Sequence, residues 1–418
     1  MNILLRSAKI IDSNSKYHNQ KMDILVKNGV IADIAKNIDL PNNCKEIRLK
    51  NLHVSNGWFD TSVSLGEPGY EERENIIHGL NVAGCSGFTK VALNPNTFPL
   101  IDNKSAVEFL IQKSASAPVE LYPIANLTQG AAGKEMAELY DMKNSGAIAF
   151  GDYNKSLENA NLLKIALLYT QNFEGIVMSF PQDAGIGNHG FVNESENTTR
   201  LGLNSIPNLS EELQISRDLA LLAYTGGKLH IPTITTAKAV QLIKEAKKKG
   251  LDVSCSVAAH HIFLTDEEIK SFDTNFKVRP PLRSLKDTKA LLKGIKEGTI
   301  DMIVSDHNPI DIENKNVEFE NGVYGTIGME SLFGSARINL DLDETIACLT
   351  EKPCKRFDLP VSIIEKEAKA ELTLFDPDLV YTFEKDDILS KSKNSAFLGK
   401  ELKGKAYGIY ANKKLLMN

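Results

Sequence analysis

The stretch WFDTSVSLGEPG, residues 58–69, joins a short apolar run to a turn rich in glycine and proline. Runs of this kind recur along the chain and alternate with longer segments whose apolar residues fall at i, i+3 and i+4, which indicates repeated strand–helix units with parallel strands. Eight such units predict a (β/α)8 TIM barrel, an α/β fold whose functional groups gather at the carboxyl ends of the strands. The predicted strands cover residues 58–64, 88–94, 119–126, 147–152, 175–180, 228–234, 252–258 and 301–306.

The two ends of the chain differ from the barrel. Both alternate apolar and polar residues with a period of two, which is typical of antiparallel sheet. We therefore predict a barrel over residues 55–365 and one small, sandwich-like β domain built from residues 1–54 and 366–418. Residues 183–208 follow the fifth strand, show little pattern and are too long for a plain connector, so we expect a lid or binding loop there.

Composition limits the class of function. The 418 residues carry a formal net charge of -6 without a basic stripe, which argues against a nucleic-acid partner and favours a small molecule or a protein. The five cysteines form no CxxC pair and fit reduced thiols. No apolar run approaches the roughly 18 residues that a membrane span requires. We expect a cytoplasmic protein without a membrane segment.

Several motifs resemble, in order and over nearly the whole chain, those of the dihydroorotases of the amidohydrolase superfamily. The resemblance implies a metal-dependent hydrolase barrel that opens or closes a cyclic amide in pyrimidine biosynthesis. Its motifs are DTSVSLGEPG (60–69) for D-x-H-x-H-L-R-E-P-G, GCSGFTKVALNPNTFP (84–99) for the P-N-T-x-P segment, GAIAFGDY (146–153) for the fourth strand, VRPPLR (278–283) for N-P-P-L-R, VSDHNP (304–309) for D-H-x-P, and SKSKNSAFLGKELKG (390–404) for the C-terminal β segment.

The resemblance also implies two zinc ions, held by four histidines and by carboxylates, that activate a water for attack on the ring carbonyl. Here other residues stand at the four histidine positions. The two positions on the first strand share one face because they are two residues apart, and they hold Ser62 and Ser64. The fifth-strand position falls on Phe180, or on Ser179 if the register shifts by one residue. The sixth-strand position holds Thr233.

Two carboxylates remain at family positions, Asp152 at the bridging position of the fourth strand and Asp306 at the proton-shuttle position of the eighth. Two oxygen ligands from distant strands do not satisfy zinc, which requires three or more good ligands. We therefore expect neither zinc nor another cofactor, and a vestigial role for Asp306. The competing interpretation gives Asp306 a raised pKa and a catalytic role in a metal-free reaction.

The positions that would contact a substrate differ as well. The resemblance places Gly66 where the family has an arginine, Arg279 where it has an asparagine and Ile310 where it has a histidine, whereas Asn96 still matches. We predict that Asn96 and Arg279 bind substrate. For Arg279 two interpretations stay open, bidentate binding of a carboxylate or phosphate at the barrel mouth and a surface salt bridge.

Three further histidines lie near the ends of the last two strands. His260 and His261 are adjacent and so point to opposite faces, which lets only one of them reach the barrel mouth near His307. An alternative metal site is one interpretation of this group. We favour the other, in which all three are hydrogen-bonded core or rim residues.

Two functions of different classes follow. The first is a catalytically silent dihydroorotase homologue that serves as a structural partner, for which the resemblance suggests aspartate transcarbamoylase, or that forms a homo-oligomer. The second is an active dihydroorotase or another cyclic amidohydrolase that hydrolyses a C–N bond. The combined loss of metal and substrate positions favours the first, since each loss alone costs most of the rate of a metal–water mechanism.

Overall fold

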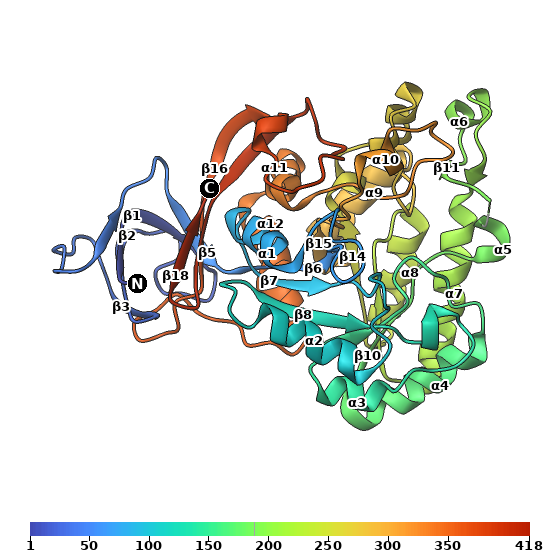
Figure 1. The fold of residues 1–418 in the computed structure, drawn as a ribbon, viewed down its shortest axis with the longest axis horizontal. Coiled ribbons are helices and arrows are strands. Elements are labelled where there is room, and N and C mark those ends of the chain that lie inside the picture. The colour runs from blue at the N-terminus through green and yellow to red at the C-terminus, as the bar shows by residue number, and fades with distance from the viewer. Residues whose placement is uncertain (188) are drawn as a thin grey trace.

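A computed structural model of the protein describes residues 1–187 and 189–418. The fold is a parallel barrel with a separate β domain at one end (Figure 1). The barrel strands follow the order β15-β14-β13-β10-β9-β8-β7-β6. All eight predicted strands are confirmed. They are β6 (Trp58–Val63), β7 (Phe88–Leu93), β8 (Glu120–Ala125), β9 (Ala149–Phe150), β10 (Ile176–Met178), β13 (Lys228–Ile231), β14 (Val253–Ala258) and β15 (Met302–Val304).

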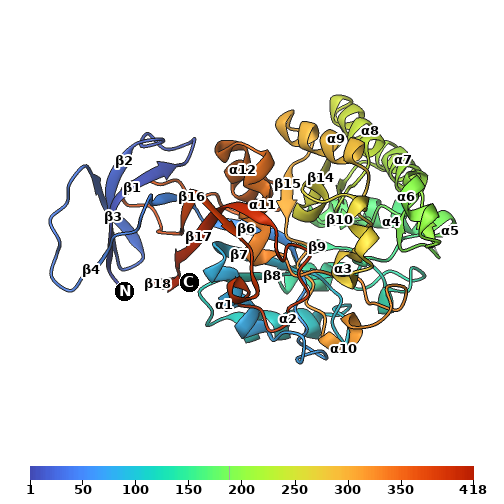
Figure 2. The same cartoon turned by 90° about the horizontal axis from the view of Figure 1, so that it is seen from above.

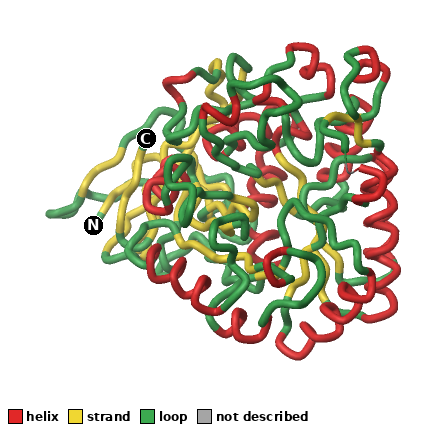
Figure 3. Tube along the Cα trace, turned by 45° about the vertical axis from the view of Figure 1, so that its right-hand side comes forward, coloured by secondary structure: helices red, strands yellow, loops and turns green. Residues whose placement is uncertain are grey.

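Helices cover the outside of the barrel strands (Figure 3). Capping side chains define several helix starts, as where Thr236 accepts a hydrogen bond from the backbone N–H of Ala239 and Ser284 from that of Asp287. Among the described residues no helix is both long and apolar enough to cross a membrane. The main helices are α1 (Ile76–Cys85), α2 (Lys104–Ser114), α3 (Leu139–Asn144), α4 (Ala160–Thr170), α7 (Asn208–Thr225), α8 (Ala237–Lys248), α9 (Leu285–Lys296), α11 (Met329–Asn339), α12 (Leu342–Leu349) and α13 (Glu351–Arg356).

The barrel closes where its first strand meets its eighth. The backbone N–H of Ser64 donates to the carbonyl of His307 at 2.7 Å. The buried Asp60 carboxylate accepts from the backbone N–H of Ser305 at 3.2 Å. Burial raises the pKa of Asp60 to about 7. This closure brings the ends of β6 and β15 together at the barrel mouth.

The two chain ends form one eight-stranded sheet, in the order β18-β17-β16-β5-β1-β2-β3 with β4 beside β1. Its two halves share an apolar core that contains Ile24 and Ile31 from one end of the chain and Leu372 and Tyr410 from the other, which is a sandwich-like arrangement. The strands are β1 (Ile3–Ile11), β2 (Lys21–Lys27), β3 (Val30–Ala35), β4 (Lys45–Ile47), β5 (His53–Asn56), β16 (Leu372–Thr382), β17 (Glu401–Ala411) and β18 (Lys414–Met417).

The expectation of a purely antiparallel sheet was wrong. β1 pairs in parallel with both β4 and β5, so the sheet is mixed. The reason lies in the junction with the barrel. β5 leads almost directly into barrel strand β6, so the barrel sets its direction, and the local alternation of residues carries no information about that constraint.

The segment 183–208, where we expect a lid or binding loop, has secondary structure of its own. It contains α5 (Ala184–Gly187), β11 (Val192–Asn193), α6 (Glu196–Arg200) and β12 (Ser205–Ile206). The buried Arg283 guanidinium holds it to the barrel by donating to Asn193 Oδ1 at 2.9 Å and to the carbonyl of Ile206 at 2.7 Å. The segment is therefore anchored to the barrel by Arg283, which follows the carboxyl end of β14.

The barrel and the β domain are joined through a buried junction. Trp58 packs against Phe333 and Phe375, with ring centroids 4.6 Å and 5.5 Å apart. Beside it, the ammonium group of Lys90 pairs with the carboxylate of Glu371, and both side chains are almost fully buried. In Figure 2, β16 of the β domain and β6 and β7 of the barrel, which carry four of these residues or adjoin them, lie where the two sheets meet.

Lys90→Met leaves the Glu371 carboxylate buried without its ammonium partner, so we expect the free energy of unfolding to fall by about 3 kcal/mol. Adding Glu371→Leu removes both charges and should recover most of the loss. Urea denaturation followed by the fluorescence of Trp58, the single tryptophan, measures both effects. Equal stability of Lys90→Met and the unaltered protein would contradict a stabilising role for the pair.

Candidate active site at the barrel mouth

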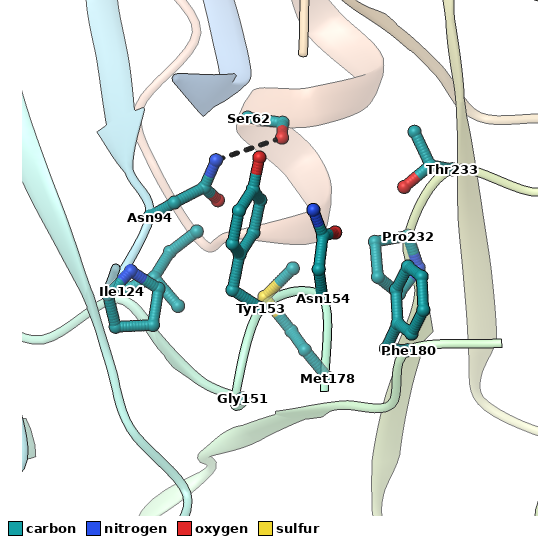
Figure 4. A pocket seen from close by; sticks show the side chains of 11 residues that line it. Ser62, Asn94, Ile124, Gly151, Tyr153, Asn154, Met178, Phe180, Pro232 and Thr233 are labelled. Carbon is teal, nitrogen blue, oxygen red and sulfur yellow. Dashed lines mark hydrogen bonds between the residues drawn. The ribbon is translucent and has the colours of Figure 1, made fainter. Parts of the chain in front are cut away.

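Side chains from five strand ends converge at the barrel mouth (Figure 4). Ser62 comes from β6, Asn94 from the end of β7, and Tyr153, Phe180 and Thr233 from the segments that follow β9, β10 and β13. Together they leave a free volume of about 20 Å³. A cavity of this size has room for about one water molecule.

A hydrogen-bond network lies under this cavity. Ser62 Oγ donates to Asp306 Oδ1 at 3.0 Å, and the Asn94 amide donates to the hydroxyl oxygens of Ser62 and Ser64, each at 3.2 Å. The Tyr153 phenol lies beside Asp306 and Ser64. Protein hydroxyl groups thus satisfy the carboxylate, and the two serines at the histidine positions serve as hydrogen-bonding residues.

Burial dominates the electrostatics of Asp306. It raises the pKa of this carboxyl group to about 6, against the opposing effect of the neighbouring Ser62 and Tyr153 hydroxyl groups. Burial likewise raises the pKa of Tyr153, so the phenol stays protonated. A carboxyl group that titrates near neutral pH can accept or release a proton under ordinary conditions.

Asp152 does not join this network. Its Oδ1 accepts the backbone N–H groups of Leu127 at 3.0 Å and Thr128 at 3.1 Å, and its Oδ2 accepts the Thr128 hydroxyl at 2.5 Å. The carboxylate therefore holds the turn after β8. The next residue, Tyr153, has a φ of 53° and is the one whose side chain enters the cavity (Figure 4).

The structure decides between the two candidates on the fifth strand. Ser179 Oγ donates to Asp218 Oδ2 of α7 at 2.6 Å and so points away from the mouth, whereas Phe180 lines the cavity. Thr233 also lines the cavity. His230 is buried in the core, hydrogen-bonded to Ser254 at 2.8 Å, and burial lowers its pKa to about 3.

Arg279 lies near the wall of the cavity. Its guanidinium carbon is 5.7 Å from the Phe180 ring centroid and 5.6 Å from that of Tyr324, and its Nε donates to Gln182 Oε1 at 3.1 Å. Among the described residues no carboxylate pairs with it, so a surface salt bridge is not what the structure shows.

The other proposed substrate positions lie outside the cavity. A Cβ atom at Gly66 would overlap the carbonyl oxygen of Tyr70, so the backbone turn leaves no room for an arginine. Ile310 is buried, and its N–H donates to Asn394 Oδ1 at 3.1 Å. Asn96 does not line the cavity, and its buried Oδ1 has no partner among the described residues.

The three late histidines are all fully or almost fully buried. His261 Nε2 lies 3.0 Å from the carbonyl of Pro280, and His307 Nδ1 accepts the N–H of Gly328 at 3.2 Å. His260 differs from our expectation, because neither of its ring nitrogens has a hydrogen-bond partner in the described part of the chain. Residues 1–187 and 189–418 contain no group of three or more His, Cys, Asp or Glu side chains placed to hold a metal ion.

Sequence analysis missed Tyr153 and Asn94. Asn94 is a polar residue at the carboxyl end of a predicted strand, which is a usable signal in a barrel. Tyr153 gives a weaker signal, because the family position is its neighbour Asp152 and only the left-handed backbone turns the phenol inward.

Solved structures with the same fold span the whole chain. The L-hydantoinase (dihydropyrimidinase) of Arthrobacter aurescens superposes with a TM-score of 0.85 at 19% identity and covers 100% of this chain and 96% of its own. A dihydropyrimidinase from Brevibacillus agri gives a TM-score of 0.83 at 16% identity. At such identities the likeness concerns the fold alone.

Sequence comparisons are more specific. Residues 53–239 match the dihydro-orotase-like family and residues 189–402 match the amidohydrolase family. The dihydroorotase of Syntrophus aciditrophicus is 36% identical over 97% of this chain and 96% of its own length, and that of Acetivibrio thermocellus is 36% identical over 98% and 97%. The chain belongs to the dihydroorotase family of the amidohydrolases.

Proposed function

We propose that this chain is a dihydroorotase-family protein of pyrimidine biosynthesis that has lost zinc-dependent hydrolysis and acts as a structural partner of another protein. The observation that carries the proposal is the filled barrel mouth, where Tyr153 reaches Asp306 and only about 20 Å³ stays free. The coarser part, a cyclic amidohydrolase fold of the dihydroorotase type, follows from the family itself.

The side chains at the metal positions do not fit zinc. Zinc in proteins is bound by thiolates, imidazoles and carboxylates. The positions Ser62, Ser64 and Thr233 supply neutral hydroxyls, and Phe180 supplies none of these donors. The Asp152 carboxylate accepts hydrogen bonds from the turn after β8, so among the family's metal positions, all of which the structure describes, Asp306 supplies the remaining carboxylate at the mouth.

The small volume of the cavity also argues against substrate binding. Pockets that bind small molecules usually enclose about 300 Å³ or more, and the mouth encloses about 20 Å³. A dihydropyrimidine ring would enter only if Tyr153 and Phe180 moved. Such a move would take the Tyr153 phenol away from Asp306 and Ser64.

Aspartate transcarbamoylase is the partner that we propose, on the strength of the family resemblance, because dihydroorotase-like chains often assemble with it. A full-length fold without its chemistry is consistent with a role carried by its surface. Co-purification from native extract should recover the transcarbamoylase, and recovery of this chain without it would count against the partner.

The alternative is an active cyclic amidohydrolase that uses Asp306 as a general base without metal. One observation favours it, the pKa of about 6 for a carboxyl group beside a cavity that accommodates one water. In that case Asp306→Asn should abolish hydrolysis, and the rate should rise with pH as the carboxyl group ionises near pH 6.

We expect the purified protein to contain far less than one zinc ion per chain and to hydrolyse no dihydroorotate above background. Elemental analysis after mild dialysis and a hydrolysis assay measure the two quantities, with the Syntrophus aciditrophicus dihydroorotase as positive control. About two tightly bound zinc ions per chain would overturn the proposed loss of the metal centre. Robust turnover would overturn the silent function.

Asp306 should make stability depend on pH. Its pKa is raised from 3.8 to about 6 in the folded chain, so the folded chain holds a proton that the unfolded chain has lost between these values. The free energy of unfolding of the unaltered protein therefore falls as the pH rises through this window. Asp306→Asn cannot ionise, so across the window its free energy of unfolding should rise by about 3 kcal/mol relative to that of the unaltered protein.

Urea denaturation of both proteins from about pH 4 to about pH 7 measures this gain. Asp141→Asn, at an exposed position, is the matched control and should leave the pH profile unchanged. If the free energies of unfolding of Asp306→Asn and of the unaltered protein differ by a constant amount over this pH range, Asp306 does not bind a proton in the folded chain as we propose.

Rebuilding the ligand set should restore zinc uptake but not turnover. The variant that carries histidine at the four ligand positions should bind zinc, and adding Tyr153→Ala, which clears the phenol from Asp306, should tighten the zinc Kd by roughly tenfold or more. Dihydroorotate hydrolysis should stay at background, because Gly66 and Ile310 offer no group for the substrate carboxylate. Strong hydrolysis by the four-histidine variant would contradict this assignment. The four changes are Ser62→His, Ser64→His, Phe180→His and Thr233→His.

A further inference from the structure

A second and larger cleft is separate from the mouth cavity. Three segments that are far apart in the sequence form most of it, residues 272–275 after β14, residues 310–317 after β15 and residues 385–398 between β16 and β17. Its free volume is about 730 Å³, which lies within the range of clefts that bind small molecules. No described residue lines both this cleft and the mouth cavity.

Four lysines line the cleft, and in the described part of the chain none of them forms an ion pair with a carboxylate. Three of their ammonium groups donate to backbone carbonyl oxygens instead, those of Thr274, Glu71 and Ile388. A carbonyl oxygen satisfies a donor but does not neutralise its charge. We call this feature the lysine cleft, and its lysines are Lys315, Lys385, Lys391 and Lys393.

The acidic side chains of the lysine cleft already have other partners. Asp311 Oδ2 lies 3.1 Å from Arg73 Nε, and Glu72 Oε1 lies 3.7 Å from the same nitrogen. Asp273 Oδ1 accepts the backbone N–H of Asn275 at 2.8 Å. With Arg73 counted, five cationic groups stand against three carboxylates. The cleft is therefore positive, on a chain whose formal net charge is -6.

Lys315 is the buried member of this group. It ends the short helix α10 (Ile312–Lys315) and is only 5% exposed. Burial lowers the pKa of its ammonium group to about 7. A buried cation is costly unless an anion or a full set of acceptors compensates it, and its acceptor among the described residues is the carbonyl of Thr274 at 2.7 Å. The other N–H groups of this ammonium are available to an anion in the cleft.

Hydrogen bonds hold the walls of the lysine cleft in place. The Asn394 amide donates to the carbonyl of Asn308 at 3.1 Å, and its Oδ1 accepts the N–H of Ile310 at 3.1 Å. Ser392 Oγ donates to the carbonyl of Arg73 at 3.1 Å. The motif at residues 390–404 contributes no lining residue to the mouth cavity, and it builds one wall of this cleft. Because the cleft is preformed, a ligand loses little affinity to the ordering of the chain.

Part of the lysine cleft is apolar. Phe272, Ile312 and Val317 line it and are 45%, 73% and 38% exposed. An exposed aromatic ring offers a face on which a planar group can stack. A cleft that combines unpaired ammonium groups with such a ring suits an anion that also carries a planar, weakly polar part.

We propose that the lysine cleft binds an organic phosphate, with the phosphate group held by its lysines and a planar ring packed on Phe272. An ammonium group binds phosphate as a point charge and needs no fixed fork geometry, which suits lysines that come from two separate segments. The volume of about 730 Å³ accommodates a molecule of the size of a nucleoside monophosphate. This inference goes beyond the proposed function, because it depends neither on turnover at the mouth nor on a protein partner.

Calorimetric titration with adenosine 5′-monophosphate tests the proposal, because this probe carries both a phosphate group and a planar ring. At low ionic strength the unaltered protein should bind it with a Kd below about 1 mM. Inorganic phosphate lacks the ring and should bind roughly fivefold more weakly or worse. Adenosine lacks the charge and should bind more weakly still. Undetectable binding of the monophosphate at about 5 mM, or equal affinity for it and for either fragment, would overturn the proposal.

Charge changes in the lysine cleft test where the phosphate group binds. Lys391→Glu, at an exposed position, should weaken binding of the monophosphate about tenfold or more, because it puts a carboxylate among the phosphate contacts. Lys315→Met should weaken it as well. Lys289→Glu, exposed on α9, is the matched control and should leave the Kd unchanged. Thermal melting shows whether each variant folds, and the exposed Lys391→Glu decides the test if the buried Lys315→Met does not.

A change at Phe272 separates the two halves of the ligand. Phe272→Ala should weaken binding of the monophosphate by roughly fivefold or more and leave the affinity for inorganic phosphate unchanged. Lys391→Glu should weaken both. Binding of the monophosphate that responds to neither Phe272→Ala nor Lys391→Glu would place the ligand elsewhere on the chain and overturn the proposal.

Discussion

Closure of the barrel between β6 and β15 is the constraint on which the rest of the site depends. The backbone bond from Ser64 to His307 and the acceptance of the Ser305 N–H by Asp60 fix the two strands in register. That register places Ser62 within 3.0 Å of Asp306. Asp60 is fully buried at this junction, and burial raises its pKa to about 7.

A buried carboxylate is costly unless donors satisfy it, and Asp306 has its donors within the protein. Ser62 donates a hydrogen bond to it and the Tyr153 phenol lies beside it, while Asn94 donates to the two serine hydroxyl oxygens. Under our proposed function the mouth is therefore a packed and hydrogen-bonded interior. It stabilises the strand ends by the same interactions that leave no room for a substrate.

The barrel could be predicted because parallel strands that are buried on both faces appear as continuous apolar runs. Three features could not. The choice between Ser179 and Phe180 depends on a one-residue register that flips every side chain. The position of Tyr153 depends on a left-handed φ of 53°, and the parallel pairing of β1 with β5 depends on the direction that the barrel imposes. Each is set by tertiary structure rather than by local pattern.

Helix α7 links the interior to the surface. Its buried Asp218 accepts from Ser179, the residue before the cavity-lining Phe180, and its buried Glu211 accepts the backbone N–H of Thr235, two residues beyond the cavity-lining Thr233. The inner face of α7 thus holds the ends of two barrel strands by hydrogen bonds to carboxylates. Ile215, Leu219 and Leu222 of α7 are buried beside these carboxylates, so apolar packing and hydrogen bonds to buried carboxylates together fix the helix against the strand ends that carry the cavity-lining residues.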